Sequence, residues 1–581
     1  MKKSVVLVIV VCILALSLSG LVGCIDGSSK QLDAPIVWMS GNVAIWGEDT
    51  NATKFELSLN GSLISVPNTT TSRALTSGQT LKVRAVGDNV NHLTSEWSNL
   101  VSYYDPNSGS GSGNGSGGSS SGGSSGGSTG GSPNPNSAID LNFVMINDTH
   151  GAFTDSSAGY SIGRVDGLIQ ELTEEKGEQI FIQNGDAFQG SYVSGETYGL
   201  TMLEALNAME LDCFVIGNHE FDWGLDKIAR FADGDSSNGE ADFPFLGANI
   251  YYAGTTTRPD WIEPYTIVEQ DGVKVGIIGV IGYGQESSIL TRYAAPYDFA
   301  EPLPLIESNA KYLRDTLKCD VVVVSTHDYD ESLNENIAKL SGQYRIDAIF
   351  CGHTHQNIDE FETRADLKQI PVAQCYHKNN TVAEVILELD GNKQYLSALI
   401  EKHEPYDNDI TERVQSVITK YQYLIDEANE VLGTTSDYLN KGTLGRSAAS
   451  ELLSYAYTEN TYGDIDAAII NTGGVRATID RGNITRADVF EVFPFNNAVV
   501  IVNMSGKLLK SLIGTNESYF YYSVKSSVGD YTNLSDNTTY QLAVIDYVFE
   551  GTRYYQFEGC TYTQTDVLLR EVLIDYIERV Y

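Results

Sequence analysis

The chain has little positive charge for its length. Its 581 residues include 37 Lys and Arg against 76 Asp and Glu, which gives a formal net charge of −39. A surface this acidic repels a phosphate backbone, so nucleic-acid polymers are not expected as partners. A small anionic ligand would need local positive charge, supplied by a few arginines or by metal ions.

Cysteine is scarce as well. Beyond residue 24 there are five, and they are Cys213, Cys319, Cys351, Cys375 and Cys560. An odd number without short regular spacing is not a disulfide framework. Several lie in apolar, strand-like runs, so buried thiols are expected, with one bridge among them left open.

Long apolar runs are absent after the first 23 residues, and no later window reaches 18 apolar residues. Residues 1–23 have a basic start, an apolar stretch over 5–18 and the ending Leu21-Val22-Gly23, directly before Cys24. This resembles a bacterial lipoprotein signal peptide, cleaved before Cys24, which is then lipidated. It implies a lipid-anchored protein of the cell envelope that faces the extracytoplasmic side; an ordinary signal peptide or an uncleaved anchor is the alternative.

Residues 105–137 are almost entirely Gly and Ser, with two prolines near the end, and they predict a flexible linker. Before it, residues 33–104 show short alternating strands between polar turns, which predicts a small all-β sandwich. The order of Pro35, Trp46, Phe55 and Trp97 resembles a fibronectin type III domain, although Leu81 stands where that family usually has Tyr. An unrelated β-sandwich is the alternative. The module shows no catalytic cluster, so a spacer or adhesive role is expected.

Three further segments follow the linker. Over 138–405, apolar strand-like runs alternate with helical stretches, which predicts an α/β domain with buried sheets and helices on their outer faces. Residues 408–432 carry apolar residues at helical spacing and predict one connecting helix. Residues 433–581 predict a second α/β or α+β domain. The fold class is therefore multidomain.

Histidine is rare, but its placement is not random. Of only eight histidines, most follow directly after apolar strand runs, together with Asp and Asn. The strand over 141–146 leads to Asp148 and His150, that over 179–183 to Asp186, and that over 213–216 to Asn218 and His219. The runs over 321–324 and 347–350 lead to His327 and to His353 and His355. Because sites in α/β sheets form at the carboxyl ends of strands, these side chains are expected to gather at one edge.

The spacing within the pairs favours a metal site. Asp148 and His150 are two residues apart, as are His353 and His355, and in an extended chain such residues point the same way. Imidazole, carboxylate and amide ligands suit divalent ions such as Zn²⁺, Mn²⁺ or Fe²⁺. The glycines beside them, Gly185, Gly217 and Gly352, permit tight turns and close backbone approach.

Taken in order, the five fragments resemble the calcineurin-like metallophosphoesterases. The stretches 217–224 and 243–249, and the C-terminal stretches 471–476, 482–485 and 493–497, narrow this to a resemblance to the bacterial 5′-nucleotidase, UDP-sugar hydrolase and 2′,3′-cyclic phosphodiesterase family. The resemblance covers roughly residues 138–560. It implies a metallophosphoesterase domain followed by a 5′-nucleotidase C-terminal substrate domain.

The resemblance also implies site residues. One metal would take Asp148, His150, Asp186 and His355, and the other would take Asp186, Asn218, His327 and His353. Two divalent ions are implied, with Zn, Mn, Co and Fe not distinguished. His355 departs from the Gln or Asn of many relatives, which could shift the metal preference. His219 and Asp222 would form the catalytic pair that assists attack by a metal-bound water.

For the substrate, the family pattern points to the C-terminal domain. The implied substrate-binding residues are Asn471, Gly474, Arg476, Phe495, Asn497 and Tyr555. Phe495 and Tyr555 would sandwich a nucleobase, although the glycine-rich loop that normally carries the second aromatic is mostly lost here. A further phosphate-binding arginine of the family is absent, and Lys441 lies near its place.

The expected function is an extracytoplasmic two-metal phosphohydrolase that releases phosphate from nucleotides. The alternatives on the same metal core are a UDP-sugar hydrolase, a 2′,3′-cyclic nucleotide phosphodiesterase and a hydrolase of sulfur-oxyanion esters. An alternative of another class is a surface-anchored binding or adhesion protein with a vestigial hydrolase. The oligomeric state stays open.

Overall fold

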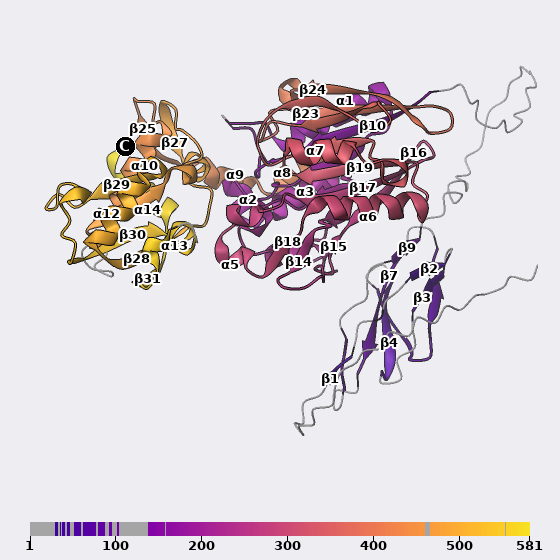
Figure 1. The fold of residues 1–581 in the computed structure, drawn as a ribbon, viewed down its shortest axis with the longest axis horizontal. Helices are drawn as coiled ribbons and strands as arrows, with labels where there is room; N and C mark the ends of the chain where they lie inside the picture. The colour runs from indigo at the N-terminus through magenta and orange to yellow at the C-terminus, as the bar shows by residue number, and fades with distance from the viewer. Residues whose placement is uncertain are drawn as a thin grey trace, which may run out of the picture. The chain divides into compact units, whose positions relative to one another are not determined.

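The computed structural model separates into two compact units, residues 1–126 and 127–581 (Figure 1). The residues that it describes are 30–32, 35, 38–40, 43–46, 52–59, 62–76, 79–87, 92–95, 101–103, 138–156, 158–458, 465–551 and 554–581. The predicted signal peptide with Cys24 and the predicted linker over 105–137 lie outside these residues. Among the described helices, none combines the length and the apolar character that crossing a bilayer requires.

The first unit contains β-sheets, as the sequence predicts. Its strands are β1 (Lys30–Gln31), β2 (Trp38–Ser40), β3 (Val43–Ile45), β4 (Lys54–Leu59), β5 (Ser62–Pro67), β6 (Ser72–Ala74), β7 (Gln79–Val86), β8 (His92–Leu93) and β9 (Val101–Tyr103). A three-stranded sheet has the order β2-β3-β6 and a four-stranded sheet the order β5-β4-β7-β9. Trp46 and Phe55 pack edge to face in one core that both sheets share. The fibronectin type III assignment stays a prediction, because Trp97 is not among the described residues.

The domain after the predicted linker, residues 138–405, is built on two stacked sheets. Because the sequence predicts the catalytic residues here, it is called the catalytic domain below. The seven-stranded sheet has the order β15-β13-β12-β11-β10-β23-β24, and the six-stranded sheet has the order β16-β17-β19-β20-β22-β21. The strands are β10 (Ile139–Ile146), β11 (Ile180–Asn184), β12 (Cys213–Val215), β13 (Phe245–Leu246), β14 (Ile250–Tyr252), β15 (Ile262–Glu263), β16 (Tyr265–Gln270), β17 (Val273–Ile281), β18 (Tyr297–Phe299), β19 (Val321–His327), β20 (Ala348–Phe350), β21 (Ile358–Thr363), β22 (Gln369–Gln374), β23 (Val382–Leu389) and β24 (Tyr395–His403). Strands β10 to β12 run parallel, as do β17, β19 and β20.

Side-chain alternation sorts each strand between two cores. In β10, Phe143 and Met145 point into the core between the sheets, while Val144 and Ile146 point to the core under the helices. The helices of this domain are α1 (Ile162–Lys176), α2 (Tyr192–Glu196), α3 (Leu200–Ala208), α4 (Asp226–Ala229), α5 (Thr291–Ala294), α6 (Pro302–Asp315) and α7 (Glu331–Ala338). Helices α1 and α3 cover the seven-stranded sheet, whereas α6 and α7 cover the six-stranded sheet. The predicted arrangement of buried sheets with helices outside is confirmed.

The connecting segment is not one helix, which corrects the prediction for 408–432. It forms α8 (Glu412–Lys420) and α9 (Gln422–Ala428), and the two meet at Tyr421, whose ψ of 17° departs from helical values. Thr411 caps the start of α8 by accepting a hydrogen bond from the Val414 N–H. The predicted apolar face is real, since Val414, Ile418 and Tyr421 all pack into the core under α1 and α3. The apolar residues keep their helical spacing across Tyr421, so the sequence pattern gives no sign of the break between the two helices.

The C-terminal domain holds a mixed five-stranded sheet of order β29-β26-β30-β28-β31 (orange to yellow in Figure 1). Its strands are β25 (Val431–Thr435), β26 (Ala467–Asn471), β27 (Gly482–Thr485), β28 (Ala498–Ser505), β29 (Phe520–Val524), β30 (Thr539–Ile545) and β31 (Thr561–Leu568), and its helices are α10 (Lys441–Thr458), α11 (Arg486–Val492), α12 (Gly506–Thr515), α13 (Asp546–Glu550) and α14 (Leu569–Val580). β25 pairs with β27 and begins two residues before the predicted boundary at 433. The five cysteines beyond residue 24 are free thiols, so no bridge forms among them.

Candidate active site

Five strand ends bring the predicted metal ligands together, as the sequence indicates. Asp148 and His150 follow β10, Asp186 follows β11, and Asn218 follows β12. The remaining histidines come from the second sheet, where His327 is the last residue of β19 itself and His353 and His355 follow β20. The gathering therefore takes place where the carboxyl ends of two stacked sheets meet, and not along the edge of a single sheet.

The local backbone differs from the expectation of an extended chain. Asp148, His150, Asp186, His353 and His355 all have positive φ, between 48° and 70°. Left-handed conformations are costly for residues with a side chain, and where they persist they cluster at functional sites. The convergence of the pairs is thus correct, but its cause is a pair of tight left-handed turns and not the alternation of an extended strand.

The neighbouring glycines are required by close packing, as predicted. A Cβ on Gly185 would lie 2.2 Å from Nδ1 of His327, and a Cβ on Gly217 would lie 2.3 Å from Oδ1 of Asp186. Both distances are far below van der Waals contact. Any larger residue at either position would displace one of the candidate ligands.

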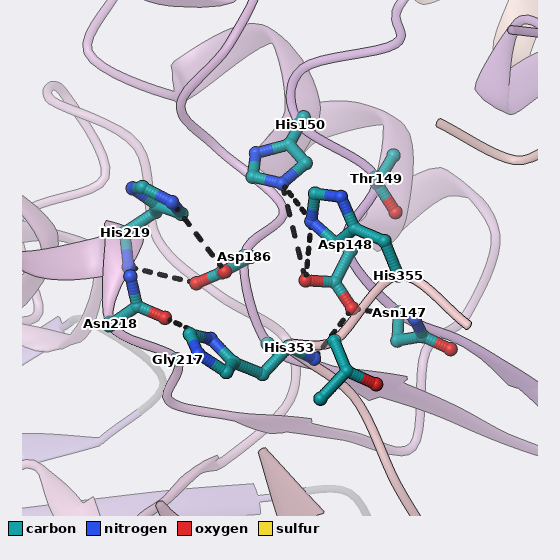
Figure 2. A network of polar contacts seen from close by, with 12 residues as sticks. Asn147, Asp148, Thr149, His150, Asp186, Gly217, Asn218, His219, His353 and His355 are labelled. Atoms are coloured by element: carbon teal, nitrogen blue, oxygen red, sulfur yellow. Dashed lines mark hydrogen bonds and ion pairs between the residues drawn. The ribbon is translucent and has the colours of Figure 1, made fainter. Parts of the chain in front are cut away.

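The first cluster consists of Asp148, His150 and His355 (Figure 2). The Nε2 atoms of the two histidines are 3.0 Å apart, and Nε2 of His355 lies 3.3 Å from Oδ1 of Asp148. The other carboxylate oxygen, Oδ2, accepts hydrogen bonds from Asn147 Nδ2 and from the His353 N–H. Oδ1 is buried and accepts no hydrogen bond from any residue that the structure describes, so it is left to face the two imidazoles.

The second cluster consists of Asp186, His327 and His353, with Asn218 between the two histidines. Oδ1 of Asn218 lies 3.2 Å from Nε2 of His327 and 2.8 Å from Nδ1 of His353. Oδ2 of Asp186 is buried and accepts no hydrogen bond from the described residues. Its distance to Nε2 of His327 is 3.0 Å, which makes the two a close ion-pair contact. Asp186 also groups with His150 of the first cluster, so it stands between the two.

These residues fit bound cations. Oδ1 of Asp148 and Oδ2 of Asp186 are buried and accept no hydrogen bond from the described residues. Burying such charged oxygens costs free energy unless a positive charge compensates them. His150 and His327 place their Nδ1 atoms 3.1 Å and 2.9 Å from the backbone carbonyls of Gln189 and Asn184, so a proton on Nδ1 leaves Nε2 open toward the cluster. The set of Asp, His and Asn ligands suits divalent ions of the Zn²⁺, Mn²⁺ and Fe²⁺ type.

The pKa shifts of the cluster residues also favour the binding of cations. Burial, followed by the positive charges of His219 and His355, holds the pKa of His150 well below its usual value, so this ring is neutral and able to bind a metal. Burial, followed by His327, lowers the pKa of His353 to about 4. Burial alone would raise the pKa of Asp186, but the charges of His327 and His219 outweigh it and keep this carboxylate ionised.

The two residues predicted to form a catalytic pair lie in contact. Nδ1 of His219 lies 2.7 Å from Oδ2 of Asp222, and Nε2 of His219 faces Oδ2 of Asp186 at 4.0 Å. Burial would lower the pKa of His219, but the carboxylates of Asp222 and Asp186 outweigh it and raise the pKa to about 9. His219 is therefore protonated at neutral pH, with one N–H held by Asp222 and the other directed toward the metal clusters.

Glu220 is a buried residue beside the site for which the sequence predicts no role. Its side chain is fully buried and accepts three backbone hydrogen bonds of 2.8 to 3.0 Å, from the N–H groups of Gly217, Asp186 and Ala187. The carboxylate thus ties the loop after β11 to the loop after β12, and these loops carry Asp186 and Asn218. The one sign of it in the sequence is its position directly after His219, in the segment that follows a strand.

A cavity of about 500 Å³, called the catalytic cavity below, opens beside the clusters. The predicted residues that line it are Asp186, Asn218, His219, Asp222, His353, His355, Asn471, Gly474, Arg476, Phe495 and Asn497. Both domains contribute to it. Every predicted ligand and catalytic residue belongs to the clusters or to this cavity, so the alternative of a vestigial hydrolase gains no support.

The two predicted base-stacking residues have different placements. Phe495 lines the catalytic cavity, with its ring stacked on that of His219 at 5.5 Å and the guanidinium of Arg476 5.8 Å from its centre. Tyr555 is 62% exposed, has its hydroxyl 3.3 Å from Oγ of Ser511 and does not line the cavity. The expected pairing of Phe495 with Tyr555 is therefore absent from this structure. Tyr547 is the C-terminal tyrosine that lines the cavity.

A second cavity, of about 580 Å³, lies beside the first cluster and is called the cationic cavity below. Its lining includes the cationic residues Lys378, Lys441 and Arg476. His355 and His377 also line it, and their rings stack with their centres 4.5 Å apart. Lys378 is paired with Glu491 at 3.5 Å, whereas burial and the charge of Arg476 lower the pKa of Lys441. This is the local positive charge that an anionic ligand of so acidic a protein requires.

Polar contacts hold the C-terminal domain against the catalytic domain at the site. The guanidinium of Arg292 binds Asp546 at 2.8 Å and Glu550 at 2.6 Å, and Asp546 in turn accepts a hydrogen bond from Nδ2 of Asn497. Gln189 Nε2 donates to the carbonyl oxygen of Pro494, next to Phe495. These cross-domain partners have no spacing signal in the sequence, since they come from unrelated segments.

Comparison with known proteins agrees with this geometry. Residues 141–357 match the calcineurin-like phosphoesterase family, and residues 428–528 match the 5′-nucleotidase C-terminal domain. The chain is 24% identical over 422 residues to the trifunctional nucleotide phosphoesterase protein YfkN of Bacillus subtilis, a match that covers 66% of the chain but only 28% of that relative. It is 23% identical over 513 residues to protein UshA of Yersinia enterocolitica, covering 76% of the chain and 91% of UshA.

Among solved structures, a 5′-nucleotidase precursor from Thermus thermophilus superposes with a TM-score of 0.65 at 20% identity. The superposition covers 76% of this chain and 97% of that structure, and shows that the fold is shared. The two domain matches, with the His and Asp clusters, identify a phosphoesterase hydrolase of the 5′-nucleotidase family.

Proposed function

We propose that the protein is a two-metal nucleotide phosphohydrolase that works outside the cytoplasm and releases phosphate from nucleotides. The observation that carries the proposal is the pair of clusters with Asp186 between them, each with a buried carboxylate oxygen that accepts no hydrogen bond from the described residues. When bound there, two divalent cations would polarise the phosphoryl oxygens and lower the pKa of a coordinated water. Asp148, His150, Asp186 and His355 would hold one cation, and Asp186, Asn218, His327 and His353 the other.

The protein's own residues then act on the phosphoester. The oxygen of water forms a bond to phosphorus, the ester P–O bond breaks, and the proton of the water passes to solvent. His219 would give the proton on its Nε2 to the leaving oxygen. Asp222, at 2.7 Å from Nδ1, orients the ring and stabilises its charge.

The nucleotide would be bound mainly by the C-terminal domain. Arg476 lines both the catalytic and the cationic cavity, so it is placed to contact phosphate oxygens. Phe495 supplies a ring face within the same cavity, and Asn471 and Asn497 supply amide groups. This part of the proposal rests on the similarity to the nucleotide phosphoesterase YfkN and on the lining of the cavities.

A panel of substrates with varied metals tests the proposal. The metal-free enzyme is reconstituted in turn with Zn²⁺, Mn²⁺, Co²⁺ and Fe²⁺, and its activity is measured on nucleoside monophosphates, UDP-sugars, 2′,3′-cyclic nucleotides and thiosulfate esters. Phosphate release from a nucleotide at the highest kcat/KM, lost in the metal-free protein, is expected. A higher kcat/KM on thiosulfate esters, or activity without metal, would overturn the proposal.

The cellular location is part of the proposal and rests on the sequence Leu21-Val22-Gly23-Cys24. We expect lipidation of Cys24 to tether the mature protein to a membrane, with its catalytic part on the extracytoplasmic side. Replacing Cys24 by Ala should release the protein from the membrane fraction or block its processing. An unchanged mature N-terminus with unchanged fractionation would contradict the lipid anchor.

A further inference from the structure

His377 lies beside the metal clusters, and the proposed mechanism gives it no role. Its imidazole ring stacks on that of His355, with the ring centres 4.5 Å apart and the ring planes 19° from parallel. It belongs to none of the groups of described residues whose side chains could together hold a cation. His377 therefore touches one ligand of the first cluster without being a ligand itself.

The ring of His355 lacks a support that other ligand rings have. Nδ1 of His150 and Nδ1 of His327 lie 3.1 Å and 2.9 Å from backbone carbonyl oxygens, and a partner of this kind fixes the orientation of a metal-binding imidazole. Among the residues that the structure describes, none forms a hydrogen bond with Nδ1 of His355. His150 meets this ring edge to face but is itself a ligand, so His377 is the ring from outside the cluster that can fix its plane.

The turn that carries His377 is anchored to the loop of the first cluster. The N–H of Lys378 donates to the backbone carbonyl oxygen of Asp148 at 2.8 Å. On the other side of His377, the N–H of Cys375 donates to Oδ1 of Asn147 at 2.7 Å. Because these two hydrogen bonds enclose His377 in the sequence, its backbone is held in a fixed position relative to Asp148.

The flat face of the His377 ring is the part that serves this contact. Nδ1 of His377 is buried and forms no hydrogen bond with the described residues, so no such bond through this atom orients the ring. Stacked aromatic rings attract one another whether or not they carry nitrogen atoms. A phenyl ring at this position should therefore preserve the contact with His355.

We propose that His377 is a positioning residue of the first cluster. By stacking on His355 it holds this ligand with Nε2 toward Oδ1 of Asp148, which lies 3.3 Å away (Figure 2). The cation of the first cluster is then bound more tightly, because its imidazole ligand is already oriented when the metal arrives. The inference rests on the two-metal part of the proposed function and adds a residue that binds the cation only indirectly.

Titration of the metal-free protein with Co²⁺ tests the proposal without measuring activity. Elemental analysis after dialysis counts the bound ions, and visible absorption reports their coordination. His377→Ala should weaken one of the two binding steps about tenfold and leave the other unchanged. His377→Phe should stay within about threefold of the wild type at both steps. The matched control is Tyr376→Ala, at the preceding ring, which is 47% exposed and lines neither the catalytic nor the cationic cavity.

A double-mutant cycle separates positioning from a structural role of the turn. His355→Gln replaces the stacked ring by an amide that can still bind a metal through its oxygen. In this background His377→Ala should weaken binding by less than twofold, because the ring that it positions is gone. The absorption spectrum of the Co²⁺-loaded protein should likewise change on His377→Ala in the wild type and not in the His355→Gln background.

Several results would overturn the assignment. They are an equal loss at both binding steps, no loss at either, a His377→Phe variant as weak as His377→Ala, or the same loss in both backgrounds of the cycle. A wild-type protein that binds fewer than two Co²⁺ ions would instead refute the two-metal part of the proposed function, and the inference with it. Unfolding temperatures of the metal-free variants separate all of these outcomes from misfolding.

Discussion

The catalytic domain and the C-terminal domain build the same site in different ways. In the catalytic domain the chemical groups stand at the ends of buried strands, in turns where even one added carbon atom would collide with a ligand. In the C-terminal domain the groups that face the cavity are partly exposed side chains such as Phe495 and Arg476. Rigid placement suits the chemistry, because the reacting groups must be positioned to within tenths of an ångström. Surface placement suits substrate recognition, because the residues that contact the substrate can vary without loss of the reaction.

If this contrast is correct, substitutions in the catalytic domain reduce the activity on every substrate, and substitutions in the C-terminal domain reduce it selectively. The predictions below test that division, beginning with the largest expected effect.

Asp186→Asn should abolish nearly all activity on every substrate. Asp186 belongs to the second cluster and also groups with His150 of the first, and an amide cannot replace the charge of a buried carboxylate between two cations. Metal analysis of the purified variant should show loss of metal from both clusters. Asp140→Asn, at an exposed aspartate on β10, is the matched control and should keep full metal content and activity. A variant of Asp186 that retains both metals would contradict the shared position.

His219→Ala should lower kcat by about 10²- to 10⁴-fold, the range for loss of a general acid, while metal content is unchanged. His219 contacts Asp222 and faces the clusters, but its Nε2 is 4.0 Å from the nearest oxygen of Asp186. Asp222→Asn should cost less, since it leaves His219 in place as the proton donor and removes only the carboxylate that orients the ring and stabilises its charge. Metal loss in the His219 variant equal to that in Asp186→Asn would make His219 a ligand and reverse the assignment.

Glu220→Gln should weaken metal binding by about 10- to 100-fold, as for other residues that orient metal ligands. The amide of glutamine would turn its NH₂ group toward a backbone N–H that now donates to a carboxylate oxygen. Metal titration of the stripped protein measures the effect, and Glu269→Gln, at an exposed glutamate on β16, is the control. Unaltered metal affinity with a lowered unfolding temperature would show that Glu220 serves the fold alone.

The same contrast decides what could be predicted from the sequence. The ligands of the catalytic domain could be located because each follows a short apolar strand, and a strand end fixes where the next residues lie. The reason given for their convergence was wrong, since positive φ at Asp148 and His355 leaves no trace in spacing. The break at Tyr421 escaped for a related reason, because both short helices present the same apolar face to one core.

The C-terminal domain was less predictable because its contribution depends on tertiary contacts. Nothing in the spacing shows that Arg292 binds Asp546, or that Tyr547 reaches the cavity while Tyr555 does not. The prediction for Tyr555 relied on a loop pattern that this sequence retains only in part. Surface aromatics in such a loop can turn either way without cost to the core.

Phe495→Ala should raise KM for a nucleoside monophosphate about tenfold, because stacking on one base is worth about 1–3 kcal/mol and 1.4 kcal/mol is a factor of ten. It should barely alter the hydrolysis of a small aryl phosphate, which has no base. Since Phe495 also stacks on His219, the aryl phosphate is the necessary comparison. Equal losses on both substrates would show that Phe495 acts through His219, and the division between the two domains would then fail at this residue.

The smallest effect is expected at Asp212, which precedes β12 at the end of the strand opposite to the site. Burial, outweighing the hydrogen bond from the Phe181 N–H, raises the pKa of Asp212 to about 6. A carboxyl whose pKa is higher in the folded state than in the unfolded state, where it is about 3.9, favours folding only while protonated, so stability is lost as the pH rises toward and through 6. Asp212→Asn keeps the acceptor and removes the charge. It should therefore be more stable than the wild type at pH 7.5, by about 1–2 kcal/mol, and should lose about two thirds of this advantage by pH 4.5. Urea midpoints at the two pH values measure the difference, with the exposed Asp260→Asn as the control. Activity should be unchanged, because the side chain lies away from the metal clusters; a loss of activity would mean that this end of the strand also positions the ligands at the other.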